Sequence, residues 1–408
     1  MKDAVFTKYN LLLLMIPAIF TGFFPGKIIG VTMVCFYPIL FTLWYSSNKA
    51  ATKEFISIAP IKFYVIVNIS IFITGVLTLS SEQDTTVMFG NMIFLTLMYP
   101  FYILAIRARM FIPILKGTLW IVLPLCFITF FFPPTNGFMS FQHNISFVYI
   151  FLLFIPYLNL KWRVILITLA ITGLFYDLTR RSYMINLVLV LVVLLGYYLL
   201  PGKIVFQKGL KFFFLVFVVS PVILLLLGVS GVFNFFTIGD KFGEYVVGDE
   251  SKSRNILVDS RTAIYVDVFK ELVEKDAVIW GLGGNGKTKT SLSDVANANF
   301  DVIYREGRRG TESGMLNYFQ YGGIIAAFSY WLLLTTAAYN AIFKSKSSFM
   351  RMLGLFVAFK VLYSFVEDKM NVNIASFYLM FMISLCYNKI FLSLKDNELT
   401  VILKKVFK

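Results

Sequence analysis

The sequence predicts an all-α polytopic membrane protein with about twelve transmembrane helices. The 408-residue chain is 58% hydrophobic and only 14% charged, whereas soluble domains carry about 25% charged residues. Long apolar runs recur along the whole chain, and most Lys and Arg residues lie in short segments between them. A net charge of +15 distributed in this way is typical of membrane orientation and argues against a nucleic-acid-binding face.

Twelve apolar runs approach the length of about 20 residues that a helix needs to cross a bilayer. They lie near 10–24, 28–45, 60–80, 87–106, 112–132, 145–160, 163–178, 182–200, 211–230, 315–343, 352–366 and 374–393. The first, sixth, seventh and eleventh runs are short for a span. The first run resembles a signal peptide, but the many spans that follow favour an uncleaved first helix.

The positive charges predict the orientation of these spans. With the N-terminus inside, more than half of the 37 Lys and Arg residues fall at the cytoplasmic ends and tails. The short loops on the other side hold only Lys27, Arg180, Arg181 and Lys369. This bias places both termini in the cytoplasm.

One loop is long, and it divides the chain into three regions. Residues 1–230 hold nine spans, residues 231–314 form a loop outside the membrane, and residues 315–408 hold three more spans. Within the loop, Asp259 or Ser260 can cap a helix. The predicted apolar face of this helix consists of Ile264, Val268, Phe269, Leu272 and Val273.

The loop contains a match to a nucleotide-binding motif. Residues 281–288, GLGGNGKT, fit the P-loop pattern letter for letter. A P-loop also needs a parallel sheet, a following helix and a carboxylate that holds magnesium, and an outside loop of this size is too small for that domain. The glycines therefore predict a tight turn, or backbone brought close to a ligand.

The outside face carries a set of arginines. Arg180 and Arg181 stand at the outer end of the eighth span. The long loop adds Arg254, Arg261, Arg305, Arg308 and Arg309. Arginine binds phosphate and carboxylate in a bidentate manner, although lipid headgroups or a solvated salt-bridge cluster would also explain these residues.

Other polar residues give weaker signals. Glu312 precedes the tenth span and is a candidate general base or sugar ligand. Lys360 and Glu367 are seven residues apart on one helical face, which favours snorkelling or a structural pair. His143 is the only histidine, so a multi-histidine metal site is excluded.

Three stretches together resemble the bacterial O-antigen polymerases of the Wzy type, in the superfamily that includes the O-antigen ligases. They are LTRRSYMI at 178–185, DSRTAIYVDVFKELVEKDAVIWGLGGNG at 259–286, and TESGMLNYFQYGGIIAAFSY at 311–330. The multi-span layout with one long outside loop extends the likeness. The ligase branch typically has a histidine where this chain reads Thr311-Glu312-Ser313, and this departure favours the polymerase.

The resemblance implies a GT-C-like glycosyltransferase in the bacterial inner membrane. Such enzymes join oligosaccharide repeat units carried on undecaprenyl diphosphate at the periplasmic face, without a metal or another cofactor. It also implies that membrane lipids and a polysaccharide chain-length regulator are partners, and that the protein does not bind nucleic acid.

On this resemblance Glu312 and Arg261 are the catalytic candidates. The substrate-binding candidates are Arg180, Arg181, Arg254, Arg305, Arg308 and Arg309. Two alternatives stay open: a ligase-type glycan transferase, and a flippase for lipid-linked oligosaccharides. The flippase requires two similar halves, which the sequence does not show.

Overall fold

A computed structural model of the 408-residue chain describes residues 57–78, 108–128, 145–176, 181–200, 203–229, 246–247, 254–255, 261–289, 310–311, 313–367 and 374–407. The first half holds the helices α4 (Ala59–Leu77), α6 (Ala108–Gly117), η1 (Thr118–Val122), α7 (Leu123–Ile128), α9 (Val148–Phe151), η3 (Leu152–Tyr157), α10 (Leu160–Tyr176), α11 (Arg181–Leu199) and α12 (Lys203–Val229). The second half holds the strands β1 (Val246–Val247) and β2 (Arg254–Asn255) and the helices α13 (Arg261–Glu274), α15 (Gly314–Tyr339), η6 (Asn340–Lys344), α16 (Ser348–Val366), α17 (Ile374–Leu385), α18 (Lys389–Ser393) and α19 (Asp396–Val406).

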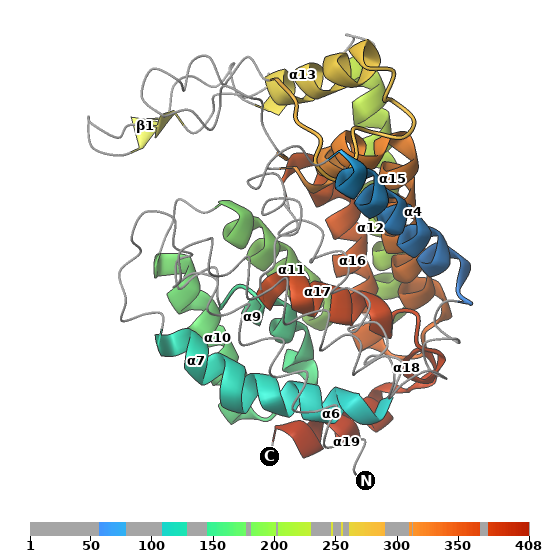
Figure 1. Ribbon diagram of the computed structural model, residues 1–408. Helices are drawn as coiled ribbons and strands as arrows, with labels where there is room; N and C mark the ends of the chain where they lie inside the picture. The colour runs from blue at the N-terminus through green and yellow to red at the C-terminus, as the bar shows by residue number, and fades with distance from the viewer. Residues whose placement is uncertain are drawn as a thin grey trace.

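The centre of the bundle is α16, which packs against α15 and α12, while α15 packs in turn against α4 (Figure 1). The helix α16 is apolar around almost its whole circumference, and a helix of that kind is stable only when other helices surround it. Ser347 caps its first turn by accepting a hydrogen bond from the Met350 amide at 3.3 Å. Gly354 lets η6 approach closely, because a Cβ there would lie 2.7 Å from the Cβ of Ala341.

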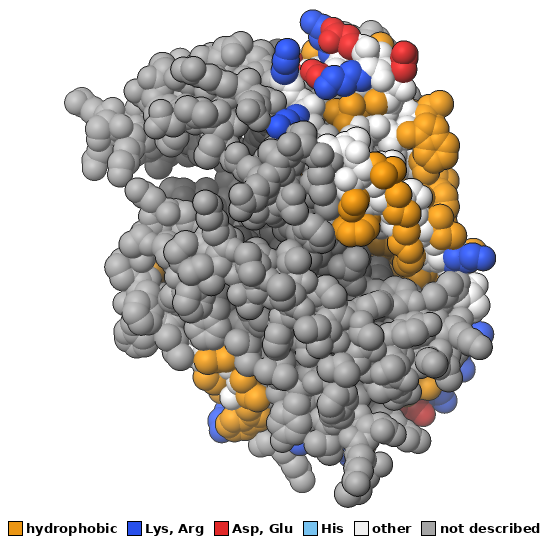
Figure 2. Space-filling view, viewed as in Figure 1, with side chains coloured by type: hydrophobic (Ala, Val, Ile, Leu, Met, Phe, Trp, Pro, Cys, Tyr) orange, Lys and Arg blue, Asp and Glu red, His pale blue; other side chains and the backbone are white. Residues whose placement is uncertain are grey.

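Five helices are long and apolar enough to cross a membrane, within the part of the chain that the structure describes. They are Ala59–Leu77, Ser182–Leu199, Ile204–Leu225, Gly314–Lys344 and Ser348–Val366. Four of them expose rows of large apolar side chains, such as Ile66, Ile69 and Ile73 on α4. Figure 2 shows an apolar surface over α4 and α15, with charged side chains gathered over α13 at the top. The chain is therefore a mostly helical protein of membrane character.

Several predicted spans take other forms in the structure. The run 145–160 becomes α9 and the 3-10 helix η3, whose residues are nearly all buried. The run 112–132 becomes α6, the π-helix η1 and α7. The run 374–393 divides into α17 and α18, because Asn388 caps a new helix there. The runs 10–24, 28–45 and 87–106 lie outside the described residues.

The N-terminal end of α16 is held by the helix α19, which packs on α6 (Figure 1). Asp396 accepts hydrogen bonds from the Ser348 amide at 2.8 Å and from its hydroxyl at 3.0 Å. It also accepts one from the Tyr157 hydroxyl at 2.8 Å. One carboxylate thus joins α19, η3 and the start of α16, and it defines the end of the bundle opposite α13.

Candidate functional site

The helix α13 is clamped to the bundle at the junction where α15 begins and α16 ends. Its buried face is Ile264, Val268 and Leu272, as the sequence predicted. Val273 was predicted on the same face but is 64% exposed, because it lies about 100° around the helix from Leu272. The Tyr265 hydroxyl donates a hydrogen bond to the Phe365 carbonyl. The Tyr265 hydroxyl oxygen also lies 3.0 Å from Ser313 Oγ.

The start of α15 is held by a compact polar network. Ser313 is the N-cap and accepts from the Leu316 amide at 3.3 Å, while its own hydroxyl lies 2.9 Å from the Ser364 carbonyl, to which it donates. The Asn317 side chain accepts from the Thr311 amide at 2.5 Å and donates to the Thr311 carbonyl at 3.1 Å. The chain is therefore anchored on both sides of position 312.

Two ionisable side chains, Glu367 and Lys360, lie in the last two turns of α16 and the residue that follows it. Glu367 follows α16, and its carbonyl accepts from the Gly314 amide at 3.0 Å. Tyr363 donates its hydroxyl hydrogen bond to Glu367 Oε2 at 2.7 Å. One turn earlier, Lys360 is only 2% exposed, and its ammonium lies 5.2 Å from the centre of the Tyr363 ring. Lys360 therefore packs inside the bundle, so of the two predicted alternatives snorkelling is wrong and a structural pair stays open.

The glycine loop, residues 281–286, inserts into a break in α15. The break lies at Gly322 and at Gly323, whose φ is +62°. In an unbroken helix the Ile324 and Ile325 amides would bond to the carbonyls of residues 320 and 321. Here those carbonyls accept from Leu282 at 2.8 Å and Gly283 at 3.0 Å.

The residues just before the glycine loop accept hydrogen bonds from the two α15 amides that the break leaves without helical partners. The Ile324 amide donates to the Val278 carbonyl at 2.9 Å, and the Ile325 amide donates to the Ile279 carbonyl at 3.4 Å. Four hydrogen bonds to the segment 278–283 thus use two carbonyls and two amides that an unbroken α15 would pair with each other. Non-helical backbone at membrane depth is tolerated only when protein satisfies its polar groups, and the glycine loop meets this condition.

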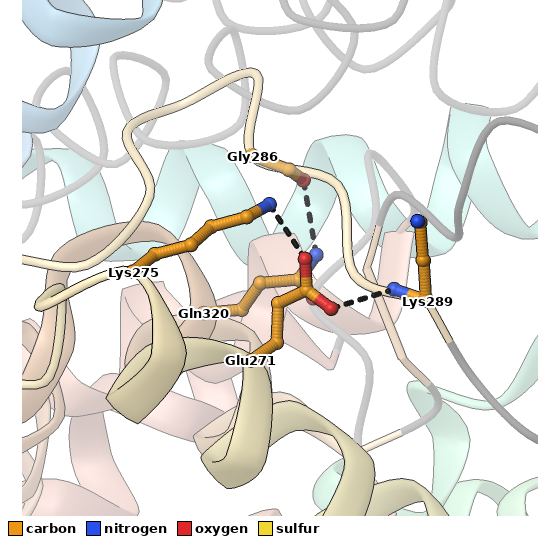
Figure 3. A network of polar contacts seen from close by, with 5 residues as sticks. All are labelled: Glu271, Lys275, Gly286, Lys289 and Gln320. Carbon is orange, nitrogen blue, oxygen red and sulfur yellow. Dashed lines mark hydrogen bonds and ion pairs between the residues drawn. The ribbon is translucent and has the colours of Figure 1, made fainter.

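Side chains hold the glycine loop from two further directions (Figure 3). Gln320 on α15 donates to the Gly286 carbonyl at 3.0 Å. Glu271 on α13 pairs with Lys275 at 2.6 Å and accepts from the Lys289 amide at 3.4 Å. The loop therefore connects α13 to α15 through contacts on both helices.

The glycine loop is not arranged to cradle phosphate, because five of its six amides already donate within the protein. Besides Leu282 and Gly283, the Gly281 amide donates to Ala277, the Gly284 amide to Ile71 and the Gly286 amide to Gly283. A nucleotide-binding P-loop uses such amides for the phosphates. The glycines allow the backbone of the loop to come close to other parts of the protein rather than to a ligand.

Positions 181, 254 and 261 are the predicted site residues that the structure describes, and they belong to three different elements. Position 261 begins α13, one turn before Tyr265, and so belongs to the junction. Arg181 begins α11, where Tyr183 packs on Tyr149 and Tyr149 on Phe356, opposite the middle of α16.

The remaining arginines lie elsewhere. Arg254 is in strand β2, and its partner β1 lies away from the helices (Figure 1). Position 254 is therefore not part of the junction. Arg180, Arg305, Arg308, Arg309 and Glu312 lie outside the described residues, as does His143.

Sequence reasoning missed Tyr265 and Asn317 at the junction, and it missed the helix break in α15. The pair Gly322-Gly323 inside an apolar run was the available signal, because two adjacent glycines weaken a helix by about 2 kcal/mol relative to alanine. No group of three or more His, Cys, Asp or Glu side chains that could hold a metal occurs among the described residues. No family model, curated protein or solved structure matches this chain.

Proposed function

We propose that this protein polymerises oligosaccharide repeat units carried on undecaprenyl diphosphate, at the periplasmic face of the bacterial inner membrane. The proposal includes twelve spans, two cytoplasmic termini and a GT-C-like arrangement. The observation that supports it most is the junction of α13, α15 and α16. There Tyr265, one turn after Arg261 at the start of α13, contacts Ser313, and Ser313 and Thr311 flank position 312.

That location suits a substrate with a lipid tail and a polar head. The polyprenyl chain would lie against the apolar faces of the spans, while the diphosphate and the sugars lie beside the polar α13. Arginine neutralises the charge that develops on a leaving diphosphate without a metal. In the proposal Arg261, Arg180 and Arg181 hold the diphosphate, and Arg254, Arg305, Arg308 and Arg309 bind diphosphate or sugar.

The reaction transfers the growing chain onto a new repeat unit. A hydroxyl of the new unit attacks the anomeric carbon of the growing chain, the bond from that carbon to the diphosphate breaks, and the lipid diphosphate leaves with the electron pair. A carboxylate at the junction orients the acceptor or takes its proton, and Glu312 is the candidate that the sequence supplies.

The test is a gel of lipopolysaccharide from the source strain after deletion of this gene. A core that carries a single repeat unit, without a ladder, is the expected result. A core without any repeat would contradict the proposal in favour of a ligase or a flippase, and accumulated lipid-linked polymer would identify the ligase. An unchanged ladder would exclude a role in O-antigen assembly.

Complementation with variants tests the arginine assignment. Arg261→Ala and Arg181→Ala are expected to shorten the ladder strongly. Lys270→Ala is the matched control, because Lys270 lies on the same helix as Arg261 with its side chain 72% exposed. Full ladders from both arginine variants would overturn the assignment.

A further inference from the structure

The carboxylate of Glu367 is fixed at the junction by its own backbone. Its amide donates to the Tyr363 carbonyl at 2.8 Å, and its carbonyl accepts from Gly314 at 3.0 Å. Residue 367 is therefore hydrogen-bonded to the first residue of α15, next to the Ser313 cap that Tyr265 of α13 contacts. Three elements that are distant in sequence meet around this one acidic residue.

The side chain of Glu367 is oriented as well as placed. The Tyr363 hydroxyl donates to Oε2 at 2.7 Å, and the buried Lys360 ammonium lies 5.2 Å from the centre of the Tyr363 ring. Glu367 is half-buried rather than solvated. A carboxylate held by a positioned donor in a partly dry setting is prepared to accept a proton from a bound hydroxyl.

The backbone contacts of the junction do not require an acidic residue at position 367. The C-terminal end of a helix favours cations, so a glutamate that ends α16 stands at the unfavourable end of the helix dipole. The contacts that hold the junction together use the carbonyls of residues 364, 365 and 367, which any residue would supply. Positions that break a local rule in this way are those where function is expected.

Three of the other described carboxylates are engaged in contacts of a different kind. Glu271 and Glu274 on α13 pair with Lys275 and Lys270. Asp396 binds the opposite end of α16, which is 19 residues long and thus about 28 Å away at 1.5 Å per residue.

We propose that Glu367 is the general base of the transfer reaction. Its carboxylate takes the proton of the acceptor hydroxyl while that oxygen bonds to the anomeric carbon and the lipid diphosphate leaves with the electron pair of the broken bond. The proton then passes from Glu367 to water at the outer face. This inference rests on the proposed function and leaves to Glu312 the role of orienting the acceptor.

The experiment uses the full-length protein in lipid nanodiscs, with lipid-linked repeat units extracted from the deletion strain. The kcat and the KM for the repeat unit are measured for wild type, Glu367→Gln, Glu367→Ala and Glu312→Gln. Glutamine still accepts the Tyr363 hydrogen bond and keeps the backbone contacts, but it takes no proton. Glu367→Gln is expected to lower kcat by about 10²-fold or more, the scale of general-base catalysis, with KM unchanged.

Glu274→Gln is the matched control, since it removes an exposed carboxylate at the same end of the molecule and is expected to keep the wild-type kcat. A Glu367→Gln variant that retains kcat while Glu367→Ala loses it would show a structural role and overturn the inference. Retention of kcat in Glu367→Gln together with its loss in Glu312→Gln would assign the base to Glu312 instead. If wild type forms no polymer from these units, the proposed function itself fails, a result distinct from both.

Discussion

Replacing Gly281 with alanine tests whether the glycine loop supports the break in α15. Gly281 has a φ of +70°, a conformation that costs an alanine about 1–2 kcal/mol. A Cβ there would lie 2.4 Å from the Gly322 nitrogen and 2.5 Å from the Gly323 nitrogen. These atoms belong to the backbone and cannot rotate away, so overpacking adds about 1–3 kcal/mol. We expect Gly281→Ala to destabilise the docked loop by about 2–5 kcal/mol.

Hydrogen exchange at the loop and the break measures this effect directly. A cost of about 2 kcal/mol raises the population of the undocked loop about 30-fold. The amides of Leu282, Gly283 and Ile324 should therefore exchange at least about 30-fold faster than in wild type, wherever exchange follows local opening.

The matched control is Gly209→Ala in α12, where an added Cβ meets no atom within 4 Å. This change is expected to leave exchange at the loop unaltered, or to stabilise α12 by about 0.5–1 kcal/mol. Wild-type exchange rates in Gly281→Ala would refute the reasoning that the loop supplies the missing hydrogen bonds of α15.

Three further predictions concern the bundle and its orientation. Asp396→Ala removes the acceptor of three hydrogen bonds and should cost about 1.5–3 kcal/mol, seen as a lower Tm in detergent, whereas Asp396→Asn should lose less. Gly354→Ala places a Cβ 2.7 Å from the Ala341 Cβ and 2.8 Å from an Ile342 carbon. It should reduce the free energy of unfolding by about 1–3 kcal/mol, measured as a lower Tm. A membrane-impermeant maleimide should label Lys275→Cys on intact spheroplasts and Lys404→Cys only after lysis, since both positions are exposed; the reverse pattern would contradict the predicted orientation.

The sequence was sufficient where local pattern controls structure. The apolar spacing in α13 predicted Ile264, Val268 and Leu272 as buried, because a 3.6-residue period is visible without any knowledge of the partner. The run 352–366 looked short for a span because Arg351 interrupts the apolar pattern. In the structure α16 begins at Ser348, where the Ser347 cap and the bond from Arg351 to the Ser345 carbonyl satisfy the polar groups of its first turn.

The sequence was insufficient where a segment depends on a distant partner. The run 145–160 has the composition of a span, yet Phe151 and Phe154 pack inside the bundle against Tyr378 and Phe349. The glycine loop matches the P-loop pattern without being one. A P-loop and a docking loop both need glycine, because glycine lets the backbone come close to its partner. Only the partner, phosphate in one case and a broken helix in the other, distinguishes them.

The break in α15 has a consequence for the candidate site. Besides its buried apolar face, α13 is held to the spans at two places, through Tyr265 at the junction and through the glycine loop at the break. A single contact would leave α13 free to pivot, whereas two contacts separated along α15 fix its position. In the proposed reaction, catalytic groups supplied by α13 and by the bundle would need such fixation, because small misplacements of reacting groups cost large factors in rate. The glycine loop is thus a support for the geometry around Glu367, although no atom of the loop needs to contact substrate.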